Sequence, residues 1–354
     1  MSSAALPWAD RPRLPVVSNC VDWLRWEGDW ISWLLSDFEV EHLCDPELQV
    51  TPGNMVLVLS GDTRPCDAQV RAYLQRVRRL GGKVVLIHLS DEWLAYPTEV
   101  YTEVEAAFRT YWRPGVMHRS IFLPLGYPSG MQAKTEPKPI ASRRHLWAFA
   151  GEVKQRRQRM LEAARRLGRG FEHLTTRWED ENALSKRDYA EVLADTVFVP
   201  CPTGNHSPES FRLYEALEAG CIPIVEEEGG ATALMEALAP ASLLRIKPWR
   251  DRRWRDVGRK ALKRSYWLAP FPDFPAPRLA HWENLPRLVD RIDLESTAAE
   301  VSRWWRDLKA RTKAEVSAAI IDRLFEPGPS PLDARRAAKA RPDPAADHRC
   351  IAKV

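Results

Sequence analysis

The sequence contains no long hydrophobic run. Nothing in its 354 residues approaches the roughly 18 consecutive apolar residues that a transmembrane helix needs. The first 20 residues carry proline and charge, and they lack the apolar core, roughly 7–15 residues long, of a signal peptide. From these absences we expect a soluble, cytoplasmic protein.

Paired cysteines and a strong net charge are also missing. The six cysteines are scattered, with no Cys-x-x-Cys pair and no histidine at zinc-like spacing, so neither a disulfide framework nor a zinc site is expected. The formal charge is only +4, and residues 327–354 contribute +3 of it through six basic and three acidic side chains. The nearly neutral remainder argues against a protein built to coat nucleic acid, so no nucleic-acid partner is expected.

The sequence does contain the alternation that is typical of an α/β fold. Hydrophobic residues make up 45% and charged residues 28%, so a chain of this length can form about two domains, each with its own core. Continuous apolar runs at 55–59, 83–89 and 120–124 predict buried strands, and a helix is expected at about 67–80. Strands that are apolar throughout are typical of a parallel sheet, because both faces are buried.

A second α/β series follows a polar, proline-containing stretch that we interpret as a linker. Its predicted strands are 146–150, 171–175, 197–201, 221–225 and 243–246, and its predicted helices are 155–168, 185–195, 208–219 and 230–238. Helices at about 283–292 and 295–324 are expected to close the chain. The predicted organisation is an N-terminal Rossmann-like domain (1–128), the linker (129–142), a C-terminal Rossmann-like domain (143–294), closing helices (295–326) and a mobile basic tail (327–354).

Four tryptophans lie on one face of a predicted N-terminal helix. Trp23, Trp26, Trp30 and Trp33 are spaced at i, i+3, i+7 and i+10. Such an aromatic stripe usually packs in a core, here against the first sheet. Two alternatives stay open: a peripheral contact with a membrane surface, and a platform on which a sugar ring stacks.

The strongest local signals lie in the segment 197–225. Ser207 followed by Pro208 predicts a helix start, and Gly220 predicts its end. The amino end of this helix would lie at the carboxyl edge of a parallel sheet. Free backbone N–H groups and the helix dipole favour an anion there, such as a diphosphate.

Arg212 and Glu215 project from one side of the same predicted helix, because they are three residues apart. The guanidinium would neutralise a phosphate, and the carboxylate would accept hydrogen bonds from vicinal ribose hydroxyls. On spacing alone, an ordinary ion pair on a surface helix is the favoured interpretation.

The same segment resembles the exostosin-like family of glycosyltransferases. The resemblance rests on a Cys-Pro-x-Gly loop at 201–204, a Ser-x-Arg-x-x-Glu-Ala motif at 210–216 and a Gly-x-x-Pro-Ile motif at 220–224. Upstream, the run Arg-His-Leu-Trp-Ala-Phe-Ala-Gly at 144–151 is followed by a basic helix, as in that family. In appearance the chain is nearest to the ribitol xylosyltransferase branch, on the run 207–225 together with 123–127.

The resemblance implies a GT-B architecture, in which two Rossmann-like domains face each other across a cleft and the second holds the nucleotide sugar. It also implies transfer of a sugar from a nucleoside-diphosphate donor, a UDP-sugar with UDP-xylose as one candidate. The acceptor would be a hydroxyl of a glycan or a polyol phosphate, and the anomeric carbon would be inverted. No tightly bound cofactor is expected, and the sequence does not indicate an oligomeric state.

Donor binding in such a site needs groups that stabilise the departing diphosphate. A GT-B enzyme can use a helix N-terminus and arginines in place of a metal, and no loop carries an Asp-x-Asp metal motif here, so we expect metal-independent transfer. The expected donor-binding residues are Arg144, Gly151, Arg156, Ser207, Ser210, Arg212 and Glu215.

A catalytic base must take the proton of the acceptor hydroxyl, and we expect it to come from the first domain. Asp91 and Glu92 follow the strand that ends at Leu89, which places them at the carboxyl edge of the first sheet. An acidic pair at a strand end caps the following helix as often as it takes part in catalysis. His206, in the loop before the predicted donor helix, is the alternative catalytic candidate.

Two functions of other kinds stay open. A GT-B epimerase or sugar phosphorylase would bind the same class of donor but release a different product. A non-catalytic module that binds a nucleotide sugar or a glycan would keep the fold without turnover. A phosphate-binding α/β regulator is disfavoured because the sequence has no matching glycine-rich P-loop.

Overall fold

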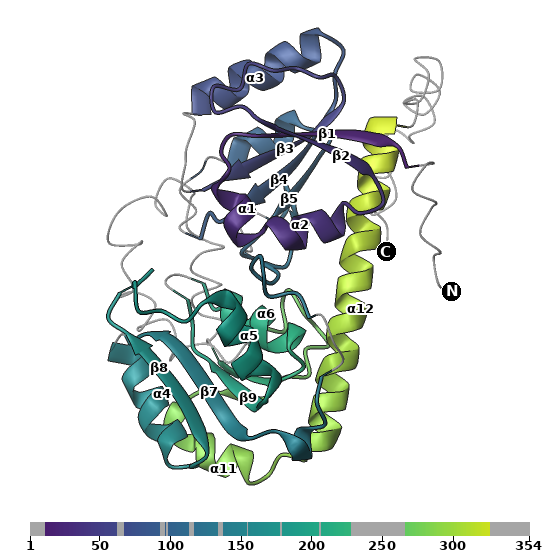
Figure 1. Ribbon diagram of the computed structural model, residues 1–354. Coiled ribbons are helices and arrows are strands. Elements are labelled where there is room, and N and C mark those ends of the chain that lie inside the picture. The colour runs from purple at the N-terminus through teal and green to yellow at the C-terminus, as the bar shows by residue number, and fades with distance from the viewer. Residues whose placement is uncertain are drawn as a thin grey trace, which may run out of the picture.

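The computed structural model describes residues 11–325 except for 62–66, 93–95, 97, 113–116, 134–136, 154, 178, 205–206 and 228–265. Two parallel β-sheets, each flanked by helices, form two units that lie one above the other in Figure 1. The predicted α/β class with two Rossmann-like units is therefore confirmed, and this pairing of units is that of the GT-B architecture.

The first sheet has six parallel strands in the order β2-β1-β3-β4-β5-β6. The strands are β1 (Arg13–Ser18), β2 (Glu39–Cys44), β3 (Met55–Ser60), β4 (Val84–Leu89), β5 (Ala106–Arg109) and β6 (Ile121–Phe122). Every residue of β3 and β4 is buried, as their apolar runs predict. The sequence did not predict β1, β2 and β5.

The second sheet has five parallel strands in the order β11-β10-β9-β7-β8. They are β7 (His145–Glu152), β8 (Gly170–Thr175), β9 (Thr196–Cys201), β10 (Ile222–Glu226) and β11 (Arg278–Leu279). Four were predicted, and the predicted strand at 243–246 and helix at 230–238 lie outside the described residues. In both sheets the strand order reverses next to the first strand, between β1 and β3 and between β7 and β9.

Helices connect these strands and close the chain. They are α1 (Asp22–Trp26), α2 (Gly28–Leu34), α3 (Asp67–Arg79), α4 (Gln155–Arg165), α5 (Lys186–Ala194), α6 (Phe211–Glu218), α11 (Leu285–Val289) and α12 (Leu294–Ile320). The long α12 runs alongside both units (Figure 1). On the first unit, Asp37 accepts a hydrogen bond from Ser317 (2.9 Å) and pairs with Lys313 (2.8 Å). On the second unit, Lys309 pairs with Glu218 (2.8 Å).

The prediction for the start of α6 is wrong. The helix begins at Phe211, and Ser210 takes the N-cap position with an extended backbone (φ −148°, ψ 158°). Upstream, Ser207 Oγ accepts a hydrogen bond from the backbone N–H of Glu209 (3.3 Å), and the Glu209 side chain turns into the core. These contacts hold 207–210 out of helical conformation, so Pro208 is not the first helical residue.

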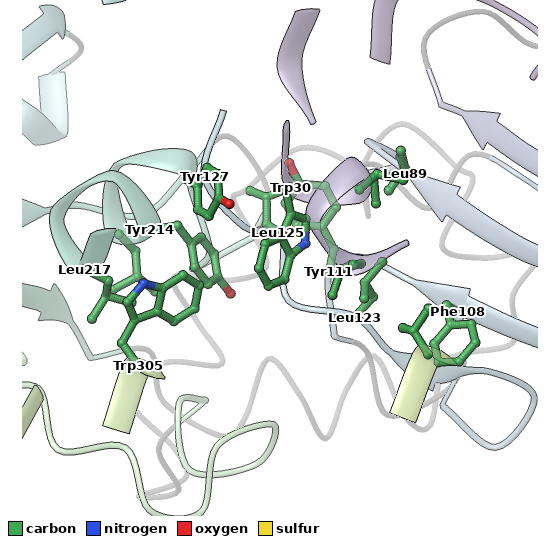
Figure 2. Close-up of a cluster of buried hydrophobic side chains, with 14 of the residues drawn as sticks. Trp30, Leu89, Phe108, Tyr111, Leu123, Leu125, Tyr127, Tyr214, Leu217 and Trp305 are labelled. Carbon is green, nitrogen blue, oxygen red and sulfur yellow. The ribbon is translucent and has the colours of Figure 1, made fainter. Parts of the chain in front are cut away.

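Two of the four tryptophans of the stripe, Trp23 and Trp30, pack in the core as the first interpretation predicts, whereas Trp26 and Trp33 are partly buried. Glu27 separates α1 from α2, so the stripe is not one continuous helix. Trp30 is fully buried, donates to the carbonyl of Pro124 (3.1 Å) and stacks on Trp305 of α12 with ring centroids 5.9 Å apart. Figure 2 shows Trp30 between side chains of the first unit and the Tyr214 and Trp305 side chains. The core is therefore continuous from one unit to the other.

Across the ranges that the structure describes, no helix is both long enough and apolar enough to cross a bilayer.

Candidate functional site

The candidate site lies at the carboxyl ends of β7 and β9, where the strand order of the second sheet reverses. Ligands of open α/β sheets bind at such a switch point, because the connections from the two strands leave toward opposite faces. Gly151 lies near the end of β7, Cys201 ends β9, and α6 follows β9 after a loop. The topology thus brings Gly151 and the α6 residues Arg212 and Glu215 to one edge.

Arg212 lies directly beside the end of β7. Its guanidinium donates a hydrogen bond to the carbonyl of Ala150 and lies 4.3 Å from the ring centroid of Phe149. Gly151 has φ +133°, and a β-carbon built on it would lie 2.9 Å from Arg212 Nη2. A glycine is therefore needed at this position for the guanidinium to lie where it does.

Two buried polar atoms at this edge, Ser210 Oγ and Arg212 Nε, have no hydrogen-bond partner among the described residues. The hydroxyl of Tyr189 on α5 interacts with the side chain of Arg212. More than nine in ten buried polar groups in folded proteins are hydrogen-bonded, so these two exceptions require an explanation. A polar ligand bound between α5, α6 and β7 would supply the missing partners.

Glu215 adds a partly buried carboxyl group to the same edge. Burial raises the pKa of Glu215 to about 7, although the positive charges of Arg212 and Lys186 act in the opposite direction. A ligand that donates hydrogen bonds would stabilise the charged form of this carboxyl group. Arg212 and Glu215 therefore place a guanidinium and a carboxyl group on the same side of α6.

The first unit faces this site through the turn that follows β4. Glu92 Oε1 accepts a hydrogen bond from the backbone N–H of Ser207 (2.9 Å), across the junction between the two units. A β-carbon on Gly204 would lie 2.9 Å from the same Glu92 oxygen. The carboxyl edges of the two sheets therefore meet at Glu92, and the role of Glu92 as a catalytic base stays a prediction.

Asp91 is placed differently from its prediction as a catalytic base. Its carboxylate is 2% exposed, pairs with Arg109 (3.2 Å) and accepts from the backbone N–H of Tyr96 (3.2 Å). The fully buried Arg109 also donates to the Asp91 carbonyl (2.7 Å). A buried carboxylate held by a guanidinium is a poor proton acceptor for a substrate, so Asp91 fixes the turn instead.

Glu209 was missed by the sequence reasoning although it lies inside the recognised segment. Its side chain accepts hydrogen bonds from the hydroxyls of Tyr214 and Tyr266, the latter at 3.1 Å, and from the backbone N–H of Trp112 at 3.4 Å. Burial raises the pKa of Glu209 to about 7, and these hydrogen bonds limit the rise. Glu209 thus joins α6 to the first unit and to the chain beyond 265.

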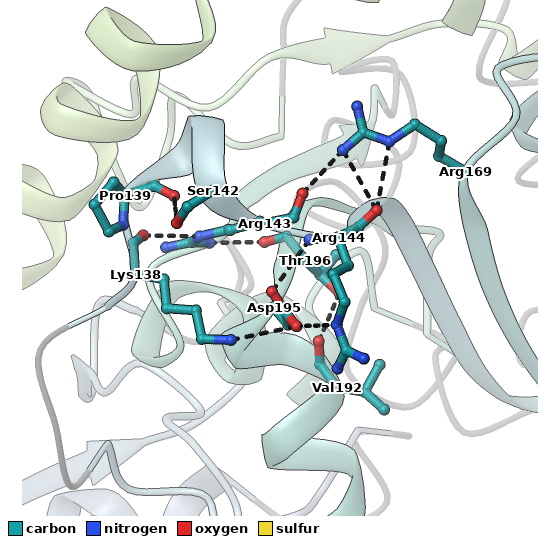
Figure 3. Close-up of polar contacts among 9 residues, drawn as sticks. All are labelled: Lys138, Pro139, Ser142, Arg143, Arg144, Arg169, Val192, Asp195 and Thr196. Carbon is teal, nitrogen blue, oxygen red and sulfur yellow. Dashed lines mark hydrogen bonds and ion pairs between the residues drawn. The ribbon is translucent and has the colours of Figure 1, made fainter.

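Arg144 lies at the wrong end of β7 to bind a ligand with Arg212. It precedes the strand, and β7 spans eight residues, so about 20 Å separates Arg144 from Gly151. Figure 3 shows Arg144 and Lys138 meeting at Asp195. Burial raises the pKa of Asp195, but hydrogen bonds from Arg144 and Lys138 outweigh it and lower the pKa to about 2. Arg144 therefore stabilises the amino edge of the sheet.

The remaining predicted residues divide into two groups. Ser207 is described, but it is buried and its hydroxyl already accepts from the backbone N–H of Glu209, while its own backbone N–H donates to Glu92 of the first unit. His206 and the side chain of Arg156 lie outside the described residues, so both stay predictions. In the part of the chain that the structure describes, no group of three or more His, Cys, Asp or Glu residues could hold a metal ion.

Comparison with known protein families finds a match over part of the chain. Residues 109–230 match the family model of the Exostosin GT47 domain, so the resemblance to exostosin-like glycosyltransferases is confirmed over this segment. No curated protein sequence matches the chain. The match supports a glycosyltransferase in general terms.

Two of the solved structures that match are similar to most of the chain. One is titled "Crystal Structure of alpha1,3-Fucosyltransferase", with a TM-score of 0.39, 9% identity, and coverage of 82% of this chain and 92% of that chain. The other is a complex of a UDP-glucosyltransferase from Polygonum tinctorium, with a TM-score of 0.39, 8% identity, and coverage of 88% of this chain and 99% of that chain.

Proposed function

We propose that this protein is a glycosyltransferase, a hexosyl- or pentosyltransferase, that uses a nucleoside-diphosphate sugar as donor. The proposed donor is a UDP-sugar such as UDP-xylose, and the proposed acceptor is a hydroxyl of a glycan or a polyol phosphate. One observation carries the proposal: buried, unpartnered polar atoms of Ser210 and Arg212 lie at the switch point of the second sheet, within the segment that matches the Exostosin GT47 domain.

The donor would bind with its diphosphate near the amino end of α6. Ser210 and the backbone N–H groups of the first turn are hydrogen-bond donors, and the helix dipole favours negative charge there. Arg212 adds a full positive charge on the β7 side. Glu215, one turn further along α6, would accept hydrogen bonds from the ribose hydroxyls.

Glu92 is the proposed catalytic base, because Asp91 is engaged with Arg109. Glu92 would take the proton of the acceptor hydroxyl while the acceptor oxygen forms a bond to the anomeric carbon. On the opposite side of that carbon, the bond to the diphosphate oxygen breaks and the electron pair leaves with the nucleoside diphosphate. Because the acceptor attacks the side opposite to the leaving group, the proposed reaction inverts the anomeric carbon. Arg212 would stabilise the charge that develops on the leaving group, so the proposed reaction needs no metal.

A transfer assay with radiolabelled UDP-sugars, with and without candidate acceptors, tests this proposal. We expect Arg212→Ala to lower turnover by roughly 10²–10³-fold, the range for removing one preorganised charge-stabilising group. Arg144→Ala is the matched control, because it also removes an arginine but at the far end of β7, and it should keep wild-type turnover. Glu92→Gln should lower kcat by roughly 10²–10⁴-fold and leave donor affinity within about twofold.

The outcomes separate the alternative functions. An epimerase would release an altered UDP-sugar without any acceptor. A non-catalytic module would bind donor in the wild type but turn over none of the donors with any acceptor. Loss of turnover in Arg144→Ala equal to that in Arg212→Ala would show that the effect is not specific to the switch-point site, and the proposal would be wrong.

A further inference from the structure

Glu209 is a buried carboxyl group at the junction between the two units. It is 1% exposed and lies in the segment that leads into α6. Removing a carboxyl group from water costs free energy, and an apolar side chain of similar volume is often neutral or stabilising at such a position. Packing alone therefore does not explain this carboxyl group, and its hydrogen bonds indicate which role it has.

The hydrogen bonds of Glu209 reach three parts of the chain. Oε1 accepts from the hydroxyl of Tyr214 on α6, and Oε2 accepts from the hydroxyl of Tyr266 at 3.1 Å. Oε2 also accepts from the backbone N–H of Trp112 in the first unit, at 3.4 Å. One side chain thus joins α6, the chain beyond 265 and the first unit.

A second contact across the junction runs in the opposite direction. Glu92 of the first unit accepts from the backbone N–H of Ser207 at 2.9 Å. Ser207 lies two residues before Glu209, and Ser210, the N-cap of α6, directly follows Glu209. Each unit therefore holds a backbone N–H group of the other with a carboxyl group. The short segment 207–209 lies between the proposed base and the amino end of α6.

Both contacts follow a residue with unusual backbone geometry. Tyr111, directly before Trp112, has φ +61°, and Ser90, two residues before Glu92, has φ +54°. The left-handed region is unfavourable for residues other than glycine, and most of all for a bulky one. Such conformations persist where the surrounding structure holds them, and they concentrate at functional sites. The strain at the ends of β4 and β5 is thus located where the first unit meets the segment 207–209.

We infer that Glu209 is a positioning residue that holds the amino end of α6 at a fixed distance from Glu92. The inference rests on the proposed function, since it takes Glu92 as the base and Arg212 as a donor-binding group. It adds that a side chain outside the reacting groups keeps the two units in register. A misplacement of about 1 Å can lower a rate by roughly 10²-fold, so this register matters for turnover.

Substitution of Glu209 in the full chain tests the inference, with kcat and donor affinity measured separately. Each variant is assayed with the radiolabelled UDP-sugar that the wild type turns over, and it is titrated calorimetrically with UDP. Glu209→Leu removes all three hydrogen bonds and should lower kcat by roughly 10²-fold, with UDP affinity within about threefold of wild type. Glu209→Asp keeps the charge but is shorter by one methylene group, so it should also lower kcat. It provides the same test if the leucine variant does not fold.

Glu209→Gln is the conservative variant. Its amide oxygen can accept from the Trp112 N–H and the Tyr266 hydroxyl, and its amide N–H can donate to the Tyr214 hydroxyl. We expect kcat within about fivefold of wild type, because these contacts remain although the charge is lost. In the Glu92→Gln background, Glu209→Leu should lower kcat by no more than about threefold further, since the base that Glu209 positions is absent.

Hydrogen exchange gives a readout that does not depend on turnover. The backbone N–H groups of Trp112 and Ser207 are the donors at the junction. Peptides that contain them should exchange faster in Glu209→Leu than in the wild type, and at the wild-type rate in Glu209→Gln. Asp195→Leu is the matched control, because it also removes a buried carboxyl group of the second unit, one that accepts from the backbone N–H of Arg144 (3.1 Å) at the amino edge of the sheet. It should lower Tm and leave both kcat and the exchange at the junction unchanged.

The results separate the inference from the proposed function. Wild-type kcat in a folded Glu209→Leu, or an equal loss of kcat in Glu209→Leu and Asp195→Leu, would overturn the positioning role. Unchanged exchange at Trp112 and Ser207 in Glu209→Leu would show that Glu209 does not hold the junction, and would overturn the inference as well. A wild type that transfers sugar from none of the UDP-sugars would contradict the proposed function, and the exchange measurement would still decide whether Glu209 joins the two units.

Discussion

Replacing Gly151 by alanine is the sharpest single test of where Arg212 lies. Gly151 has φ +133°, and a β-carbon at this position would lie 2.9 Å from Arg212 Nη2. The substitution Gly151→Ala therefore costs free energy in two ways. The backbone must hold a conformation that side chains rarely adopt, at about 1–3 kcal/mol. The guanidinium must also move away from its hydrogen bond to Ala150 and from the ring of Phe149.

The two costs appear in different measurements. Backbone strain lowers stability whether or not a ligand is present, and about 1 kcal/mol lowers Tm by about 2–4 °C for a chain of 150–250 residues. The end of an arginine side chain is flexible, so its displacement adds little further loss of stability. It removes one contact to the diphosphate, and a loss of about 1.4 kcal/mol weakens UDP binding tenfold.

Gly53→Ala is the control that separates these effects. Gly53 also has a positive φ (+100°), but nothing lies within 4 Å of a β-carbon built there. Thermal melts and calorimetric titration with UDP should show a similar fall in Tm for both variants and a tenfold weaker affinity only for Gly151→Ala. Wild-type affinity in Gly151→Ala would refute the assignment of Arg212 to the donor.

Three further predictions follow from the buried groups. Arg109→Ala removes the guanidinium that pairs with the buried Asp91 carboxylate, and should lower the free energy of unfolding in urea by about 3–5 kcal/mol; a loss below 1 kcal/mol would show that the pair is not needed. The pKa of Glu209 is raised from 4.5 to about 7 in the folded state. The stability that protonated Glu209 gives the folded state is therefore fully present below about pH 4.5 and is lost as pH rises through 7. Glu209→Gln should therefore lose less stability than the wild type between about pH 5 and pH 8 in urea unfolding, and equal losses would contradict this. Trp30→Ala should cost about 3–5 kcal/mol in the same assay, because a fully buried ring that joins both units is removed; a loss under 1 kcal/mol would show that the ring does not join them.

Strands with continuous apolar runs could be predicted from the sequence, because their signal is local. β3, β4, β9 and β10 have this pattern and were found. β1 contains Pro15, which argues against a central strand, and yet β1 lies between β2 and β3. β2 is partly exposed and β5 has four residues, so neither has a run long enough to stand out.

The candidate site could be predicted only where its residues share one short segment. Arg212 and Glu215 were found because both lie in the motif at 210–216. Arg144 was misassigned, although the direction of β7 already places a residue before the strand at its amino end. Asp91 could not be assigned correctly, because its environment depends on Arg109, which lies on a different strand.

The position of Glu92 links the stability of the junction between the two units to the proposed reaction. Glu92 belongs to the first unit, whereas the donor groups belong to the second, and the hydrogen bond from Ser207 N–H to Glu92 joins them. Their separation is fixed further away, where Trp30 of the first unit stacks on Trp305 of α12. A substitution at Trp30 that leaves the protein folded should therefore lower turnover more than donor affinity, since donor binding needs the second unit alone.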